Sequence, residues 1–525
     1  ALRAQLLLDR CEALLAMGDV AAASEAVVEL RKAASDNRLA AWAQCFEGQL
    51  TILTDPTRLH ETAVLVEDAA RRLSELGDTT GAAKGHAVHA QALAHLGQFG
   101  ACEAALDRAL AAAREAGDRR RANAVLSNAP LAALWGPSPV PRASGRCLDV
   151  VRVLRITAGA PAVEATALRC QAVLEAMRGR ADAAHRMLAA ARKTLEELGL
   201  GHALVECDLY CGLIDLFSGD AAAAEANLRK AYDGFRSLNV GTDAAQAAAL
   251  LARSLVELGR DDEALALTGE SERLGGEDLK TAIAWRTVRA RLLARSDEVD
   301  AAVEMAQTAV AIAEATDALV DHADARMALS EVLTAAGRGD DARREWQMAA
   351  DLYARKEAVV DSGISAPAPL SAAATAAAVA ATSRAGGVRA APGVKGDVSA
   401  WLRFRQALLD RDWDALAALF TADHVLVDRR SGLHMEVVGR GAFVDGVRAM
   451  WQDREHDWDI EVVGAWSDDI GLTRLRSFAE GWERHYLAVT VQRDGLCCRS
   501  ENIDLSDYDT AFARLDCAAR LQEAE

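Results

Sequence analysis

Asp428 is the residue whose type and position most directly suggest chemistry in this sequence. It ends the short apolar run "HVLVD", and a carboxylate at the end of a strand can face a pocket. Arg499 and Glu501 alternate along a later run, as do Tyr486, Ala488 and Thr490, so each set is predicted to share one face of a strand. Together with Trp451, these residues form our candidate ligand pocket. Asp428 and Arg499 in one pocket would bind a small polar ligand, or they would pair with each other.

Histidine and cysteine offer further candidates, for which a structural role is favoured. His456 and His485 stand beside carboxylates, where solvated surface groups are more common than acid–base catalysts. Cys207 and Cys211 lie one helical turn apart with His202 nearby, which is half of a metal site. Three more histidines share one repeat without an obvious carboxylate partner: His86, His89 and His95. Because the ten cysteines show no pairing framework, we expect buried thiols and no bound metal.

Charge and missing motifs exclude several classes of function. The chain has 59 Lys and Arg against 78 Asp and Glu, a formal charge of −19, so direct binding to nucleic acid is not expected. The run "SAAATAAAVAATSRAGG" is too weakly apolar for a membrane span, and no signal peptide is recognised, which predicts a cytoplasmic location. No motif for a phosphate loop, a zinc protease, an esterase or a dinucleotide is found. We therefore expect no cofactor.

Most of the chain has the pattern of a helical repeat array. Gly179, Gly219 and Gly259 are 40 residues apart, and each separates two amphipathic, Ala-rich segments. Such a glycine caps the first helix in the left-handed conformation, and an Asp after it can cap the second helix. Proline is absent from residues 162–366 but frequent in "PLAALWGPSPVP". We expect a distorted repeat near residues 130–160.

These units resemble tetratricopeptide repeats, as "LGRDDEALAL" and "LGQFGACEAALDRAL" illustrate. The 40-residue period exceeds the usual period of about 34, so the helices are expected to be longer. The longer variety is similar to the helical arms of large bacterial signal-transduction ATPases. The resemblance covers roughly residues 1–356 and implies an α-solenoid with a concave groove for a protein partner.

A linker and a second domain are predicted after the repeats. The Pro-, Gly- and Ala-rich segment 357–398 is predicted to be a linker that buries nothing. From residue 399 to 525 the pattern indicates the order α, α, β, α, β, β, β, β, α, an α+β domain with a curved antiparallel sheet. Ser506 is the expected N-cap of the last helix.

This order, with "ALFTADHVLVD" after a long helix, resembles the nuclear transport factor 2-like superfamily, which includes small polyketide cyclases and ketosteroid isomerase. The ending "HYLAVTVQRDG...ENIDLSDYDTAFARLD" is similar to versions fused to actinobacterial cyclase or ATPase regulators. The resemblance implies a cone with one open pocket and places the isomerase base at Asp428. It also implies a Tyr and an Asp that stabilise an enolate oxygen. The helix position holds Phe404, and Ala488 to Thr490 hold no acid, so isomerase activity is not expected.

The sequence therefore predicts a non-catalytic interaction and sensor region of a multidomain bacterial signalling or transcription regulator. The solenoid is expected to bind a protein partner, and the C-terminal domain to bind a small ligand or to form a homodimer. Any ATPase or nucleotide cyclase domain would lie upstream of Ala1. Two alternatives stay open: a small cyclase, isomerase or hydratase with Asp428 as base, and a passive scaffold. An enclosed polar cavity around Asp428 would favour the enzyme, and a pocket filled by Trp451 or Trp466 would oppose it.

Overall fold

The computed structural model describes residues 2–17, 19–156, 160–359, 388–390, 398–430, 433, 435–451, 457–465, 469–479, 482–505 and 507–522. Most of the predicted linker, with His456, Trp466 and Ser506, lies outside these residues, as does the side chain of Trp451. Contacts divide the chain into two units. The first comprises residues 1–140 and 161–372, and the second comprises residues 141–160 and 373–525. Each unit is described by itself.

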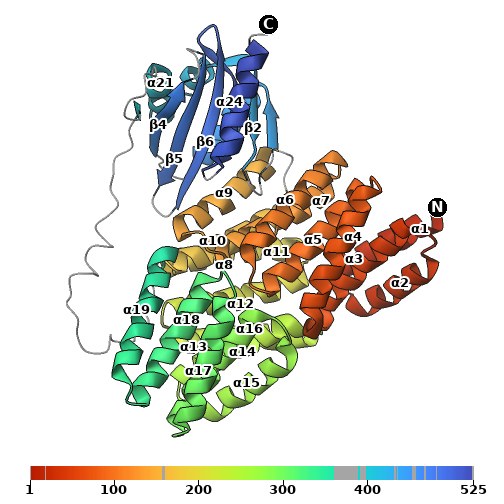
Figure 1. The fold of residues 1–525 in the computed structure, drawn as a ribbon, viewed down its shortest axis with the longest axis vertical. Coiled ribbons are helices and arrows are strands. Elements are labelled where there is room, and N and C mark those ends of the chain that lie inside the picture. The colour runs from red at the N-terminus through yellow and green to blue at the C-terminus, as the bar shows by residue number, and fades with distance from the viewer. Residues whose placement is uncertain are drawn as a thin grey trace. The chain divides into compact units, whose positions relative to one another are not determined.

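The first unit is an α-solenoid of antiparallel helix pairs, as predicted (Figure 1). Consecutive helices pack along the chain, with α5 against α6 and α12 against α13. The elements are α1 (Leu2–Met17), α2 (Val20–Ala33), α3 (Asn37–Thr54), η1 (Pro56–Arg58), α4 (Leu59–Glu75), α5 (Thr79–His95), α6 (Phe99–Glu115), α7 (Arg119–Leu126), α8 (Ala129–Trp135), α10 (Pro161–Ala176), α11 (Ala181–Glu197), α12 (Gly201–Phe217), α13 (Ala221–Ser237), α14 (Gly241–Glu257), α15 (Asp261–Gly275), α16 (Leu279–Arg295), α17 (Val299–Glu314), α18 (Leu319–Ala335) and α19 (Gly339–Lys356).

The turn between α12 and α13 confirms both predicted caps, whereas the residues after Gly179 and Gly259 make no side-chain cap. Gly219 has φ +76°, a left-handed conformation that costs glycine little, and it ends α12. The next residue, Asp220, accepts a hydrogen bond of 2.9 Å from the backbone N–H of Ala223 and so caps α13. Gly179 and Gly259 have the same sign of φ, at +76° and +71°. The 40-residue spacing therefore marks real repeats.

Distant parts of the solenoid also touch, because the helix array coils back on itself. The backbone N–H of His60 donates to Glu277, 217 residues away, and that of Phe99 donates to Asp317, 218 residues away. Lys356 at the end of α19 donates to the carbonyl of Gly136, 220 residues away. These three separations correspond to about five and a half of the 40-residue repeats. None of the described helices combines the length and apolar character that crossing a bilayer requires.

The second unit is an α+β domain whose sheet has helices on both faces (Figure 1). The fold class is thus confirmed as mainly α, with a helical repeat solenoid and an α+β domain. Its elements are α9 (Val140–Ile156), β1 (Val388–Ala390), α21 (Ser399–Leu409), α22 (Trp413–Ala417), β2 (Phe420–Asp428), β3 (Met435–Val438), α23 (Arg440–Trp451), β4 (Asp457–Ala465), β5 (Ile470–Ala479), β6 (Trp482–Arg493), β7 (Leu496–Asp504) and α24 (Tyr508–Gln522).

The seven strands form one sheet in the order β1-β4-β5-β6-β7-β2-β3. The pairings β4–β5, β5–β6, β6–β7 and β2–β3 are antiparallel, whereas β1–β4 and β2–β7 are parallel. The expected sheet was antiparallel throughout and lacked β1 and β3. Residues 388–390 pair with β4, so this part of the predicted linker belongs to the sheet. At the start of α24, Asp507 accepts a hydrogen bond from the backbone N–H of Thr510.

Helix α9 differs most from the sequence-based expectation. Residues 141–160, predicted to lie in a distorted repeat, pack with the C-terminal sheet in the second unit. Gly145 shows how close the contact is, because a Cβ atom there would lie 2.4 Å from the carbonyl oxygen of Glu483. A segment more than 200 residues earlier in the chain thereby completes the domain.

Candidate functional site

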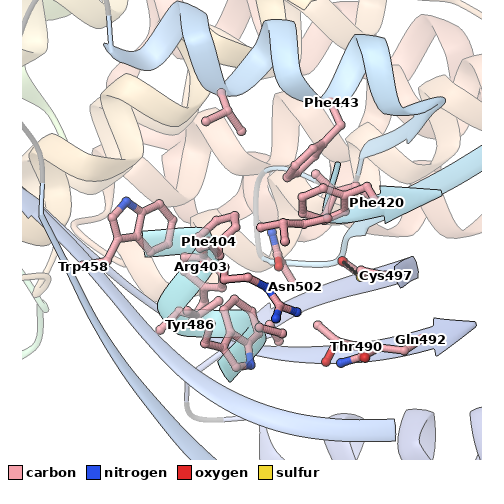
Figure 2. A pocket seen from close by; sticks show the side chains of 18 of the residues that line it. Arg403, Phe404, Phe420, Phe443, Trp458, Tyr486, Thr490, Gln492, Cys497 and Asn502 are labelled. Atoms are coloured by element: carbon pink, nitrogen blue, oxygen red, sulfur yellow. Dashed lines mark hydrogen bonds between the residues drawn. The ribbon is translucent and has the colours of Figure 1, made fainter. Parts of the chain in front are cut away.

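The second unit contains a cavity of about 100 Å³ between its inner sheet face and helices α21 and α23. Aromatic side chains from three strands and two helices dominate its lining (Figure 2). Phe404 meets the Trp458 ring edge-on at 5.6 Å, and Trp458 meets Tyr486 in the same way at 6.5 Å. The aromatic lining residues are Trp401, Phe404, Phe420, Phe443, Trp458 and Tyr486. This wall suits a flat or apolar ligand.

Polar groups occupy one part of the cavity wall. Strand β6 contributes Tyr486, Ala488 and Thr490, which confirms that these three alternating residues share a face. Strand β7 contributes Ser500 and Asn502. The charged side chains among the described lining residues are all guanidinium groups: Arg152, Arg403 and Arg484. The wall therefore combines apolar rings with positive charge.

Of the five predicted pocket residues, Tyr486 is the one that the structure places on the described cavity wall. Arg499 and Glu501 share a strand face as predicted, but it is the opposite face from Ser500 and Asn502. There Glu501 accepts hydrogen bonds from Arg429, Arg499 and Arg514. Strand β5 contributes Leu475 to the cavity wall.

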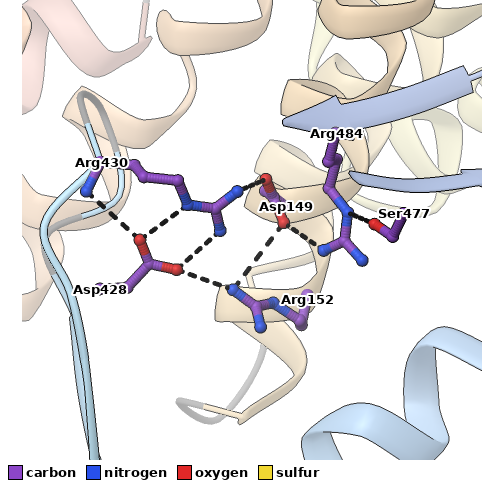
Figure 3. Close-up of polar contacts among 6 residues, drawn as sticks. All are labelled: Asp149, Arg152, Asp428, Arg430, Ser477 and Arg484. Carbon is purple, nitrogen blue, oxygen red and sulfur yellow. Dashed lines mark hydrogen bonds and ion pairs between the residues drawn. The ribbon is translucent and has the colours of Figure 1, made fainter. Parts of the chain in front are cut away.

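Asp428 lies in a buried ion-pair network instead of at the cavity (Figure 3). Its side chain is 0% exposed. It accepts hydrogen bonds from Nε and Nη2 of Arg430 at 2.9 and 2.7 Å, and from Nη2 of Arg152 at 3.2 Å. Burial raises the pKa of Asp428, but the charge and hydrogen bonds of Arg430 and the charge of Arg152 hold it below the usual 3.8. A carboxylate with these partners is structural, and its position supports no role as a general base.

Helix α9 supplies the second carboxylate of this network. Asp149 accepts hydrogen bonds from Arg430 at 3.1 Å and from Arg484 at 2.8 Å (Figure 3). Burial raises the pKa of Asp149, but the charges of Arg430, Arg484 and Arg152 outweigh burial and lower it far below the usual value. Three guanidinium groups thus share two carboxylates. Two of the three, on Arg152 and Arg484, also line the cavity.

The first unit has a larger cavity of about 290 Å³ inside its superhelix. Its wall is formed by helices α3, α5, α6, α8, α12, α13, α14 and α16. The sequence predicted a concave groove but not these lining residues. Lys280 stands 3.9 Å from the centre of the Trp135 ring and pairs with Asp321 at 2.6 Å. Amide side chains add paired donors and acceptors: Gln49, Gln91, Asn128 and Gln246. We call this cavity the interior groove.

Two histidine–carboxylate pairs cross the interior groove. His95 Nδ1 lies 2.5 Å from a carboxylate oxygen of Asp278, a residue 183 positions later in the chain. His202 Nε2 lies 3.0 Å from a carboxylate oxygen of Asp243. His95 therefore has the carboxylate partner that its own repeat lacks. His202 faces Asp243 rather than the predicted partners Cys207 and Cys211, and Cys207 is a buried thiol.

The two histidine–carboxylate pairs are expected to make the first unit less stable as the pH rises above about 6.5. Burial lowers the pKa of each histidine, but the hydrogen bonds and charges of Asp278 on His95, and of Asp243 and Glu206 on His202, raise it above 6.5. A histidine whose pKa is higher in the folded than in the unfolded state stabilises the fold at low pH. That stability is lost as the pH rises through the folded-state pKa. The free energy of unfolding, measured by urea denaturation from pH 5.5 to 8.5, should lose this dependence in the His95→Gln, His202→Gln double variant.

The control for that measurement is His60→Gln, which removes an exposed histidine that pairs with Glu277 outside the interior groove. Other histidines contribute with the opposite sign, since burial lowers the pKa of His86 to about 4. The quantity compared is therefore the difference in the free energy of unfolding between each variant and the unchanged chain at each pH. A double variant whose stability follows pH as the unchanged chain does would contradict the assignment.

Comparisons with known proteins found similar solved structures, but no protein-family model and no curated protein matches the sequence. A Rap protein solved in complex with Competence and Sporulation Factor is similar at 12% identity, over 68% of this chain and 99% of that one, with a TM-score of 0.49. Aspartyl phosphate phosphatase F from Bacillus subtilis is similar at 11% identity, over 66% and 93%, with a TM-score of 0.41. A nuclear transport factor 2-like protein of unknown function from Burkholderia xenovorans LB400 is similar at 14% identity, over 20% and 80%, with a TM-score of 0.17.

Proposed function

We propose that this chain is a binding region of a larger signalling protein and carries out no reaction of its own. The observation that carries the proposal is the interior groove, where aromatic rings, amides and paired charges converge from eight helices. An extended peptide segment of a partner protein fits this wall. The amides of Gln91, Asn128 and Gln246 can bond to peptide N–H and C=O groups, while Trp135 and Phe235 receive apolar side chains.

Selection of linear peptides from a random displayed library on the full chain tests this proposal. We expect enriched sequences whose affinity falls about tenfold in Gln246→Ala and about thirtyfold in Trp135→Ala, because a central Trp contributes about 2 kcal/mol to binding. The matched control is Gln347→Ala, an exposed amide on α19 that bonds to Asp351. Peptides that bind all three variants equally, or no enrichment, would favour a passive scaffold.

The cavity of the second unit supports a second binding function, for a small apolar molecule with an anionic group. Its rings provide the apolar surface, and Arg152, Arg403 and Arg484 provide positive charge. A volume of about 100 Å³ approaches the roughly 150 Å³ of an engineered cavity that takes benzene. A single-ring carboxylate is therefore the ligand class proposed, in preference to a role limited to dimerisation.

Fluorescence titration of the full chain with benzoate is the direct test, because Trp401 and Trp458 line the cavity. We expect saturable quenching, and about tenfold weaker binding in Arg403→Gln. Arg403 is exposed, so its loss leaves the core intact. Benzyl alcohol, which has no charge, should be insensitive to that change. Arg448→Gln, on α23 outside the described lining, is the matched control. Equal benzoate affinity in both variants, or no saturation, would refute anion recognition.

A further inference from the structure

Three side chains that can bind a metal ion lie close together in the first unit, away from the interior groove. His185 lies on α11, and Cys211 and Asp215 lie on α12. The Sγ atom of Cys211 is 3.7 Å from Nδ1 of His185, and Nε2 of the same ring is 3.0 Å from Oδ1 of Asp215. One ligand atom from each of the three residues can be chosen so that all lie within 4.8 Å of one another.

The helix geometry explains why these side chains converge. Cys211 and Asp215 are four residues apart, so they project from the same face of α12. Helix α11 packs against α12 and brings His185 to that face. Asn227, on the following helix α13, donates a hydrogen bond of 2.8 Å to Oδ2 of Asp215. Such a contact orients a ligating carboxylate in metal sites and directs the other oxygen, Oδ1, to the histidine.

The charge of Asp215 is not balanced as it is at the buried carboxylates Asp149 and Asp428. Asp215 is 3% exposed, and its partners within the described part of the chain are the His185 ring and the Asn227 amide. Asp149 and Asp428, by contrast, are each held by guanidinium groups. A buried carboxylate is costly without a full positive charge beside it. A bound cation would supply that charge.

We propose that His185, Cys211 and Asp215 bind one zinc ion, with water as the fourth ligand. Zinc accepts thiolate, imidazole and carboxylate together, whereas Mg²⁺ and Ca²⁺ select oxygen ligands. Bond lengths of about 2.0–2.3 Å place tetrahedral ligand atoms about 3.3–3.7 Å apart, within about 1.5 Å of the separations here. The imidazole turns to offer one nitrogen to the ion, and the Cys211 thiol gives its proton to solvent. The His185 side chain is 40% exposed, which leaves room for the water.

Cobalt is the probe for the test, since Co²⁺ occupies zinc sites and reports thiolate ligands by its colour. The full chain, stripped with a chelator, should bind one equivalent of Co²⁺ with a near-ultraviolet thiolate charge-transfer band and visible bands of tetrahedral cobalt. Cys211→Ser should abolish the near-ultraviolet band. Cys207→Ser, on the same helix one turn away, should retain it. Asn227→Ala should weaken binding by about 10- to 100-fold, because the carboxylate loses its orienting partner.

A measurement on the unchanged chain guards against variants that fail to fold. Zinc should slow alkylation of Cys211 by iodoacetamide, monitored by mass spectrometry, while exposed Cys517 should react at the same rate with and without zinc. The proposal is overturned if Co²⁺ gives no thiolate band, if the band persists in Cys211→Ser, or if zinc leaves the alkylation of Cys211 unchanged. In each of these cases the three residues form a hydrogen-bonded cluster only.

Discussion

Asp149→Ala is expected to destabilise the second unit by about 3–5 kcal/mol, although the substitution lies more than 230 residues before most of that unit. Asp149 is 1% exposed and accepts hydrogen bonds from Arg430 and Arg484. Without it, three buried guanidinium groups would share the single carboxylate of Asp428. Removing one partner from a buried network costs far more than removing an exposed pair, because the remaining charges stay out of water.

Hydrogen exchange of peptides from β6 and β7 measures the opening of this unit directly, so that unfolding of the solenoid does not confuse the result. The matched control is Asp445→Ala, an aspartate that is 73% exposed and 3.6 Å from Arg448. Such a surface pair contributes at most about 1 kcal/mol. Equal protection in the two variants would show that α9 does not hold the sheet through Asp149.

Lys356→Met is expected to lower the free energy of unfolding of the first unit by about 2–4 kcal/mol. The ammonium group is fully buried at the end of α19 and donates to the carbonyl oxygens of Leu134 and Gly136, each at 2.7 Å. These carbonyls lie at the C-terminal end of α8, where the helix dipole favours a positive charge. Methionine fills similar space but leaves the carbonyls without this donor, and hydrogen bonds to a charged group contribute about 1.5–3 kcal/mol each.

Urea denaturation followed by circular dichroism measures this change, because the helices of the first unit dominate the signal. Lys32→Met provides the control, since that lysine lies exposed near the end of α2. A midpoint for Lys356→Met equal to that of Lys32→Met would mean that the buried ammonium does not stabilise the superhelix.

The repeats were predictable because their signals are local. Gly219 and Asp220 determine one turn through their own backbone preference and side chain, without help from distant residues. The alternation of Tyr486, Ala488 and Thr490 likewise depends only on the geometry of a strand. The superhelical pitch, by contrast, was not predictable from local signals. It depends on small rotations added over many helix pairs, so the contact of His95 with Asp278 was not predictable from either repeat.

The candidate site was less predictable because its key charges come from a distant segment. The stretch "VDRR" contains both Asp428 and Arg430, but a strand-end carboxylate beside an arginine is compatible with a ligand pocket or with a structural pair. The structure favours the pair because α9 brings Arg152 and Asp149 against it. The proline-rich segment before α9 indicated a break in the repeats, but nothing local indicated where the next helix would pack.

The contacts between successive superhelical turns limit how this repeat array can evolve. An open solenoid tolerates the gain or loss of a unit, because each repeat meets only its neighbours. Here hydrogen bonds join residues 217, 218 and 220 positions apart. Duplicating one 40-residue unit between them would put His60, Phe99 and Lys356 opposite the wrong partners all at once. These contacts therefore restrict the number of repeats as well as their sequence, as closure restricts the number of strands in a barrel.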